Sequence, residues 1–168
     1  PLLSVEASSS ASDANAVIRR GPGYSPSAAI DGDVTTAWQS GTFASGVGEW
    51  LQLDFTRAVR ASSVLLTLPP PTRTARPTEV SVTTDRGAAT SVLSLSGGPQ
   101  EVQVPLGQFR WLRITVTAID SGSTLSGTGI SEISIPGVTL QSSLAVPEPL
   151  GPVEGLVLGN DPTKQDCA

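Results

Sequence analysis

Short runs in which apolar and polar residues alternate recur from residue 49 to residue 135. The clearest are residues 78–84, where Val80 and Val82 face one side, and residues 111–117. Turn-forming residues separate the runs roughly every eight to twelve positions. Alternation with a period of two is typical of half-buried strands, and no window carries an apolar stripe with the helical period of 3.6. The pattern predicts an all-β fold, either a sandwich or a barrel.

The remaining strand candidates are shorter. They are a segment near residues 3–8 and then residues 50–55, 64–68, 92–95, 102–104 and 130–135. Pro69, Pro70 and Pro71 end the strand before them, because proline cannot donate a hydrogen bond to a ladder. The rest of residues 1–47 is rich in Ser, Ala, Gly and Asp and is expected to be mostly loop.

The chain has 168 residues, which suits one domain. The strand pattern ends near residue 139, so we assign a β-sandwich module to residues 3–139. Residues 140–168 are rich in Pro and Gly and are expected to form a tail or linker, with residues 156–158 as one candidate edge strand. Methionine is absent, so we expect the chain to be a piece or a processed form of a longer protein.

Histidine is also absent, which removes Ser-His-Asp and Cys-His catalysis and His-ligated zinc. The single cysteine, Cys167, can form no internal disulfide. The formal net charge is −5 and no basic stripe is present, which argues against a nucleic-acid partner. No run of about 18 apolar residues occurs, so no membrane span is expected.

Residues 27–38 carry the most informative pattern in the chain. Asp31 and Asp33 flank Gly32, and Thr35 and Thr36 add hydroxyl groups. A hard cation such as calcium takes six to eight oxygen ligands, and a loop bent at glycine can supply several. The same spacing also suits an ordinary Asx turn in a solvated loop. From the spacing alone, both interpretations stay open.

Residues 29–38, Ala-Ile-Asp-Gly-Asp-x-x-Thr-x-Trp, resemble the entry motif of discoidin-like domains, also called galactose-binding-like or coagulation-factor C-type domains. Family 32 carbohydrate-binding modules are close relatives of these domains. Further segments resemble the family in the same order along the chain, namely residues 49–55, 77–87, 110–116 and 129–133. The resemblance covers residues 3 to about 139. It implies an eight-stranded antiparallel jelly-roll-like β-sandwich.

Many members of that family hold one structural calcium ion between the entry loop and the closing strand. Carried over to this sequence, Asp31 and Glu132 would supply carboxylate oxygens, and Thr36 would supply its hydroxyl and carbonyl. Backbone carbonyls would come from Ala28, Asp33 and Ser131. The alternative is that Glu132 caps a loop or pairs with an arginine. Asp31 and Glu132 as a glycoside-hydrolysing pair are rejected, because a small sandwich without a deep cleft cannot enclose a distorted sugar.

The family resemblance places three loops at one end of the sandwich, residues 39–48, 69–76 and 120–127. Their candidate sugar contacts are Gln39, Phe43, Arg73, Arg76, Asp120 and Ser126. The two arginines could equally be ordinary solvated loop charges. The loops offer no histidine and one aromatic residue, which argues against a galactose-type site. Trp38, Trp50 and Trp111 are expected to pack in the core, because aromatic side chains bury large areas.

Residues 129–138, followed by Leu144 and Pro147, resemble the ends of discoidin-like modules in actinobacterial (mycobacterial) cell-wall arabinofuranosyltransferases. This resemblance implies a non-catalytic, monomeric carbohydrate-binding module for arabinan or galactan. The module would lie outside the cytoplasm in the cell envelope and meet the membrane only through a membrane-anchored parent protein. The alternatives are a discoidin-like module that docks on protein or lipid, and an architectural domain without a working sugar site.

Overall fold

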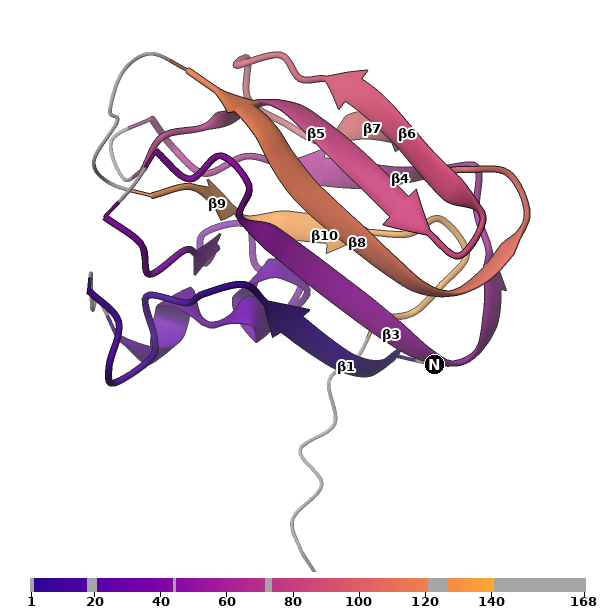
Figure 1. Ribbon diagram of the computed structural model, residues 1–168, viewed down its shortest axis with the longest axis horizontal. Helices are drawn as coiled ribbons and strands as arrows, with labels where there is room; N and C mark the ends of the chain where they lie inside the picture. Colours follow the sequence, from indigo (N-terminus) through magenta and orange to yellow (C-terminus); the bar gives the residue numbers. More distant parts are fainter. Residues whose placement is uncertain (1, 18–20, 44, 72–73, 121–126, 141–168) are drawn as a thin grey trace, which may run out of the picture.

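The computed structural model describes residues 2–17, 21–43, 45–71, 74–120 and 127–140. These residues form strands joined by loops and two 3-10 helices (Figure 1). The elements in chain order are β1 (Leu2–Ala7), η1 (Pro22–Tyr24), η2 (Pro26–Ala29), β2 (Trp38–Gln39), β3 (Trp50–Arg60), β4 (Ser63–Thr67), β5 (Pro77–Thr84), β6 (Gly87–Val92), β7 (Gln100–Gln103), β8 (Gln108–Ile119), β9 (Gly129–Ile130) and β10 (Glu132–Ser134). In this part of the chain no helix is long and apolar enough to cross a membrane.

Two antiparallel sheets form the body of the molecule. The larger has the strand order β1-β3-β8-β5-β6, and the smaller has the order β10-β4-β7. In Figure 1 the larger sheet lies in front of the smaller one. A short pair, β2 and β9, adds a third ladder beside them. The two main sheets together contain eight strands, so the predicted eight-stranded antiparallel sandwich is confirmed.

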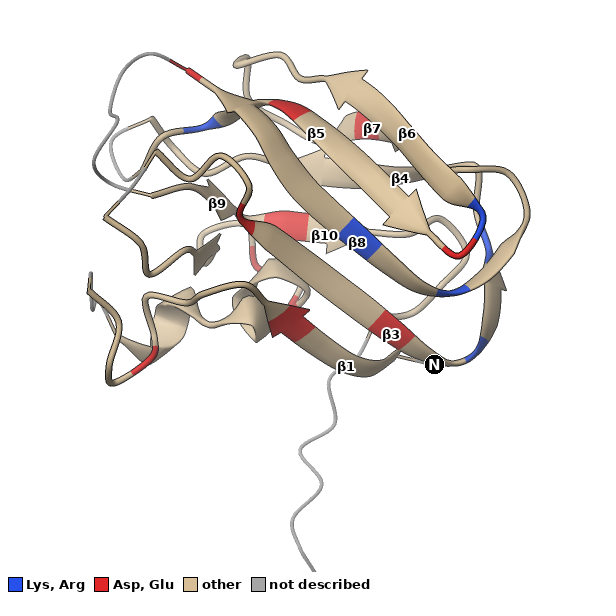
Figure 2. Cartoon of the chain, viewed as in Figure 1, with Lys and Arg blue, Asp and Glu red and all other residues tan. Residues whose placement is uncertain are grey.

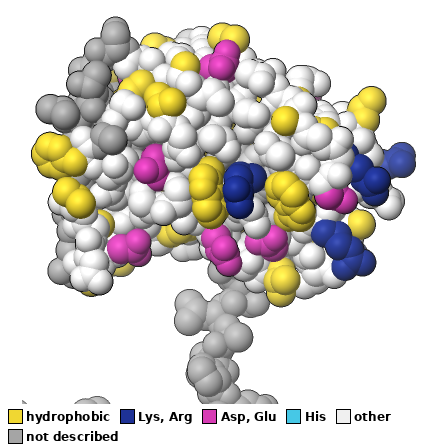
Figure 3. Space-filling view, in the orientation of Figure 1, with side chains coloured by type: hydrophobic (Ala, Val, Ile, Leu, Met, Phe, Trp, Pro, Cys, Tyr) yellow, Lys and Arg dark blue, Asp and Glu magenta, His cyan; other side chains and the backbone are white. Residues whose placement is uncertain are grey.

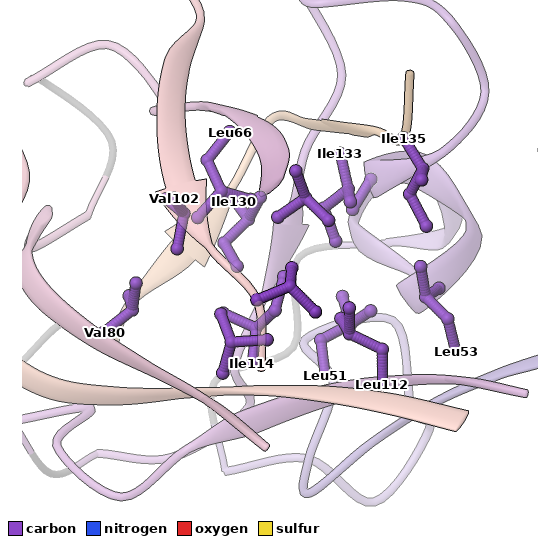
Figure 4. Packing of buried hydrophobic residues seen from close by; sticks show 14 of the residues in the cluster. Leu51, Leu53, Leu66, Val80, Val102, Leu112, Ile114, Ile130, Ile133 and Ile135 are labelled. Atoms are coloured by element: carbon purple, nitrogen blue, oxygen red, sulfur yellow. The ribbon is translucent and has the colours of Figure 1, made fainter. Parts of the chain in front are cut away.

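The core lies between the two sheets. Leu51, Leu53, Leu112 and Ile114 of the larger sheet point inward and are fully buried. Figure 4 shows them opposite a second group of apolar side chains, Leu66, Val102, Ile130 and Ile133. Burial of each such side chain stabilises the fold by about 1.5–3 kcal/mol. The alternation in the sequence therefore marks the buried face of the sandwich.

Two expectations about individual segments are wrong. The strand predicted at residues 92–95 is instead β6, which ends at Val92 and pairs with β5 in a hairpin. Trp38 is fully buried as expected, but Trp50 and Trp111 lie on the outer face of the larger sheet and are only partly buried. Successive residues of a strand point to opposite faces, so Trp50 faces outward when Leu51 faces inward.

After β10, Ile135 and Val138 form an isolated bridge and the described residues end at residue 140, so the module boundary near residue 139 stays a prediction. The predicted tail begins at residue 140, and residues 141–168 lie outside the described part of the chain. The candidate edge strand at residues 156–158 lies outside it as well.

Candidate functional site

The acidic loop comprises residues 28–36, together with Glu132, which approaches it from β10. Helix η2 begins with Pro26 and ends at Ala29, and the chain then bends at Gly32, whose φ of 82° favours glycine. The backbone N–H of Asp33 donates to Asp31 Oδ1 at 2.8 Å, and that of Thr35 donates to Asp33 Oδ1 at 2.9 Å. These local bonds are Asx turns, so the turn interpretation is correct for the loop backbone.

The Thr36 hydroxyl lies at the centre of this loop. Its Oγ1 is 2.8 Å from Asp31 Oδ2, 2.8 Å from the Asp33 carbonyl oxygen and 3.3 Å from the Ala28 carbonyl oxygen. A hydroxyl carries one proton and can donate it to one acceptor at a time. The Asp33 carbonyl also accepts from the Thr36 backbone N–H at 3.1 Å, so Asp31 Oδ2 and the Ala28 carbonyl oxygen are the acceptors that compete for this one proton. A cation among them would remove this excess of acceptors.

Glu132 brings a third carboxylate to the loop from a position 100 residues away in the chain. The Gly32 backbone N–H donates to Glu132 Oε2 at 3.1 Å. Partial burial raises the pKa of Glu132, the Gly32 bond lowers it, and the nearby charges of Asp31 and Asp33 raise it further. No salt bridge to Glu132 is present among the described residues. The Gly32 bond is the loop-capping contact of the alternative interpretation, whereas no arginine pairs with Glu132 among the described residues.

Asp33 has a different electrostatic environment. Its carboxylate accepts hydrogen bonds from the hydroxyl and the backbone N–H of Thr35, and these bonds lower its pKa. Its carbonyl oxygen, rather than its carboxylate, points toward Thr36. The role of Asp33 as a backbone ligand stays a prediction.

The donor set fits calcium in its chemistry. Within the described residues, no group of three or more carboxylate or cysteine side chains could hold a metal by itself. The candidate set is instead mixed, with carboxylate, hydroxyl and carbonyl oxygens, which are the ligands that calcium accepts. Ser131 follows Ile130 in the buried interior, and its backbone N–H donates to the Thr67 carbonyl at 2.9 Å. The Ser131 carbonyl oxygen takes part in none of the contacts described above.

The loop end comprises the described residues of segments 39–48, 69–76 and 120–127, together with Thr128, which directly follows the third segment. Thr128 joins the three segments. Its N–H donates to Ser40 Oγ at 2.9 Å, its carbonyl accepts from the Ser40 N–H at 2.9 Å, and its hydroxyl donates to the Ala75 carbonyl at 3.1 Å. Gly46 packs so closely on Thr128 that a Cβ there would lie 2.6 Å from the Thr128 Cβ. The predicted convergence of these loops is therefore present in the structure.

The candidate sugar contacts occupy different environments at the loop end. Phe43 is 57% exposed, whereas Gln39 is fully buried in β2 and has no surface to present to a ligand. Arg76 and Asp120 form an ion pair at 3.4 Å, and Asp120 also accepts from the Arg76 backbone N–H at 2.9 Å. Arg73 and Ser126 lie outside the described residues.

Arg76 is also engaged by a second partner. Its Nη1 donates to the Leu95 carbonyl at 2.9 Å. The side chains of Arg76 and Asp120 are 16% and 20% exposed. They are therefore a partly buried clamp between the second and third loops, and not freely solvated charges.

The sequence patterns missed the polar surface around Trp50 and Trp111. Both tryptophans stand on the solvent side of the central strands β3 and β8, beside Arg113. The alternation along each strand could have identified this surface. The aliphatic residues of β3 and β8 mark the inward positions, so the tryptophans next to them must point outward.

The sandwich and its acidic loop define a discoidin-like domain, and comparison with known proteins agrees. The F5/8 type C domain family matches residues 4–132, and the chain belongs to this family. The chain is 36% identical over 131 residues to an alpha-(1->3)-arabinofuranosyltransferase of Mycobacterium tuberculosis, a match that covers 78% of this chain and 9% of the enzyme. It is 32% identical over 151 residues to the enzyme of the same name from Mycolicibacterium smegmatis, covering 84% and 11%. The chain thus spans about a tenth of the length of these curated relatives.

Solved structures give the same picture. The cryo-EM structure of the mycobacterial arabinofuranosyltransferase AftD contains a similar domain, with a TM-score of 0.70 and 30% identity over 79% of this chain and 10% of that one. The family 32 carbohydrate-binding module of Clostridium perfringens NanJ, solved in complex with galactose, has a TM-score of 0.58 and 19% identity, and the match covers 79% of this chain and 91% of the module. At that identity the likeness to NanJ establishes the fold alone.

Proposed function

We propose that this chain is a non-catalytic carbohydrate-binding module that positions an arabinan-type glycan for an arabinofuranosyltransferase. The observation that carries the proposal is the 36% identity to a segment of such an enzyme, in a chain with the fold of galactose-binding modules. The segment makes up only about a tenth of the enzyme, so a supporting role beside a separate catalytic domain is the natural one. The module would act in the cell envelope and meet the membrane only through its parent protein.

The loop end is the proposed sugar site. Phe43 offers an exposed ring that can stack on a sugar, and the Arg76–Asp120 clamp fixes two polar groups on the neighbouring loops. Arg73 and Ser126 belong to the same loops and remain predicted contacts. Gln39 is fully buried in β2 and would make no contact with the sugar.

Such a site would bind weakly. It offers one described aromatic ring on an open surface, so we expect dissociation constants near the millimolar range, about −4 kcal/mol. Weak binding suffices for a module tethered to an enzyme, since tethering raises the effective concentration of the glycan near the catalytic domain. The gain in the transfer reaction would come from proximity alone.

We also propose that the acidic loop holds one structural calcium ion. Asp31 and Glu132 would supply carboxylate oxygens, Thr36 its hydroxyl and carbonyl, and Ala28, Asp33 and Ser131 their carbonyls. The acceptors around Thr36 Oγ1 and the electrostatic effect of Asp31 on Glu132 support this set. The ion would fasten a long polar loop to β10 and would take no part in chemistry.

Titration of the chain with arabinan and galactan oligosaccharides, followed by NMR, tests the sugar site. Resonances should shift in residues 39–48, 69–76 and 120–127, and Phe43→Ala should abolish the shifts. If a saturating oligosaccharide moves no resonance in these loops, the architectural alternative replaces this proposal. Co-sedimentation with lipid vesicles tests the lipid-docking alternative. Phe43 and Val47 are both exposed on the first loop and are the apolar side chains that would insert into a membrane.

A further inference from the structure

The outer face of the larger sheet carries an ordered row of aromatic and polar side chains. Trp50, Gln52 and Asp54 alternate with buried residues along β3, and Trp111 and Arg113 occupy the same face of β8. With Ser4 of β1, these residues are called the tryptophan face below. All six are partly exposed. Figure 3 shows this surface directly, with a basic side chain between two hydrophobic groups over the centre of the sheet.

Strand register sets the spacing of the row. Gln52 lies opposite Arg113, and Asp54 lies opposite Trp111. Trp50 and Trp111 are therefore four residues apart in register, which is about 13 Å along the strands, with Arg113 between them. Two aromatic side chains at this separation can contact two different units of one extended chain.

The polar members of the face are held in place before any ligand arrives. The Arg113 guanidinium carbon lies 4.1 Å from the centre of the Trp50 ring, and Arg113 Nε donates to Gln52 Oε1 at 3.0 Å. Gln52 Nε2 donates to the Asp54 carboxylate at 3.2 Å, and Ser4 Oγ donates to Asp54 Oδ2 at 3.2 Å. Side chains already ordered on a rigid sheet lose little entropy when a ligand binds.

The geometry points to a second glycan-binding surface on the tryptophan face, suited to an extended neutral polysaccharide chain. The two rings would contact the apolar faces of sugar units, and the remaining hydrogen-bonding capacity of Arg113, Gln52 and Asp54 would meet their hydroxyl groups. The inference rests on the proposed function for the class of ligand, but it uses no residue of the loop end.

The charges around the row favour a neutral ligand. Glu6 of β1 and Glu79 of β5 flank the face, and Asp54 lies within it (Figure 2). Arg113 stands among these acids and is already engaged by Trp50 and Gln52. In the described part of the chain, exposed arginines lie only toward one end of β3 and β8, so nucleic acids and anionic membranes would meet no continuous basic surface and are disfavoured.

The composition of the face also separates a glycan from a protein partner. Protein interfaces are enriched in Trp and Arg but depleted of Asp, Glu and Ser. Here Asp54 and Ser4 belong to the face, and Glu6 and Glu79 flank it. Among the described residues of the five strands, the large apolar side chains that are well exposed are Leu3 and Val92, both on the edge strands β1 and β6. The middle of the sheet therefore lacks the aliphatic patch that a protein partner would bury.

NMR titration of the 168-residue chain with an arabinan hexasaccharide tests the inference. The indole N–H resonances of Trp50 and Trp111 and the Nε–H of Arg113 should shift on binding. Trp38 is the internal control, because its side chain is fully buried, its Nε1 donates to the Ser9 carbonyl at 3.0 Å, and its resonance should stay unmoved. Trp111→Ala should weaken binding at this face about tenfold at an unchanged melting temperature, whereas Trp111→Phe should retain most of it.

The same titration separates this surface from the loop end. Phe43→Ala removes an aromatic ring from the loops and should leave the Trp50 and Trp111 shifts intact. Shifts in the indoles without shifts in the loops would support the inference and refute the loop-end site. Unmoved indoles, or wild-type binding by Trp111→Ala, would overturn the inference whatever the loops do. An anionic probe, polygalacturonate, should bind this face more weakly than neutral arabinan at low salt, and the reverse order would also overturn it.

Discussion

The acidic loop and the tryptophan face are both polar clusters, but they differ in the balance of donors and acceptors. Around Thr36 one hydroxyl proton faces three oxygens, and the carboxylate of Glu132 lies close to those of Asp31 and Asp33. On the tryptophan face each link pairs a donor with an acceptor, from Arg113 to Gln52 and from Gln52 to Asp54. We propose that a cation completes the first cluster, whereas the polar links of the second are already paired in the free protein.

This difference separates stability from binding. A cluster that needs a cation makes the folded state depend on that cation. A cluster that is already satisfied keeps its shape in the free protein and can present it to a ligand. The predictions below test this division, beginning with the largest expected effect.

Removal of calcium should produce the largest change. Binding to the folded state alone stabilises it by RT ln(1 + [Ca]/Kd), about 2.7 kcal/mol at a hundredfold excess over Kd. For a domain of this size, chelation should lower the melting temperature by roughly 5–10 °C. Calcium should restore it and magnesium should do so poorly, as differential scanning calorimetry can measure.

Two variants test whether the calcium response comes from the acidic loop. Asp31→Ala should abolish the response, because it removes a charged ligand, and Asp13→Ala should preserve it, because Asp13 lies outside the acidic loop. A melting curve that ignores calcium, in a protein shown by elemental analysis to hold no ion after chelation, would contradict the proposed site.

Glu132→Gln should have effects of opposite sign with and without calcium. Ionised Glu132 sits in a partly buried place beside two other carboxylates, and the raised pKa means that its charge is disfavoured in the folded state. Near neutral pH the neutral amide should therefore raise the melting temperature in chelator. In calcium the variant should lose most of the metal-dependent gain, because a charged ligand is gone. A variant that melts below the wild-type protein in chelator would argue that Glu132 is a purely structural cap.

The strands and the acidic loop were predictable to different degrees. Alternation located β5 and β8, because their inward residues are aliphatic at every second position. It missed β6, because Gly87 to Val92 contains small and hydroxyl residues and is defined by its pairing with β5. The prediction that Trp50 and Trp111 are buried was wrong because it rested on the large size of the indole ring. Leu51 and Leu112 mark the inward positions of their strands, so the neighbouring tryptophans face outward.

Some features of the site follow from residues that are neighbours in sequence, and others depend on the fold. The Asx turns of the acidic loop follow from Asp31 and Asp33, which are neighbours in sequence. The approach of Glu132 depends on β10 reaching the loop across the fold, and only the family resemblance indicated it. The burial of Gln39 results from the two-residue pairing of β2 with β9, which no periodic pattern could reveal.

Trp50→Ala should have a smaller effect on stability than loss of calcium. It removes the stacking of Arg113 on the indole ring, a contact worth about 0.5–1 kcal/mol at an exposed site. The melting temperature should fall by roughly 2–4 °C at most, and by the same amount in calcium and in chelator. A loss that depends on calcium would show that the two clusters are coupled.

Phe43→Ala should have the smallest effect on stability and still a large effect on ligand at the loop end. The ring is 57% exposed, and surface substitutions of this kind usually change stability by less than about 0.5 kcal/mol. The hydrogen bonds of Thr128 to Ser40 and Ala75 do not involve Phe43, so the three loops should stay joined. Calorimetry should therefore give a wild-type melting curve for a variant whose loop resonances no longer respond to oligosaccharide. A marked loss of stability would instead place Phe43 among the residues that hold the loops together, and the loop end would then resemble the acidic loop, for which we propose that shape and ligand depend on each other.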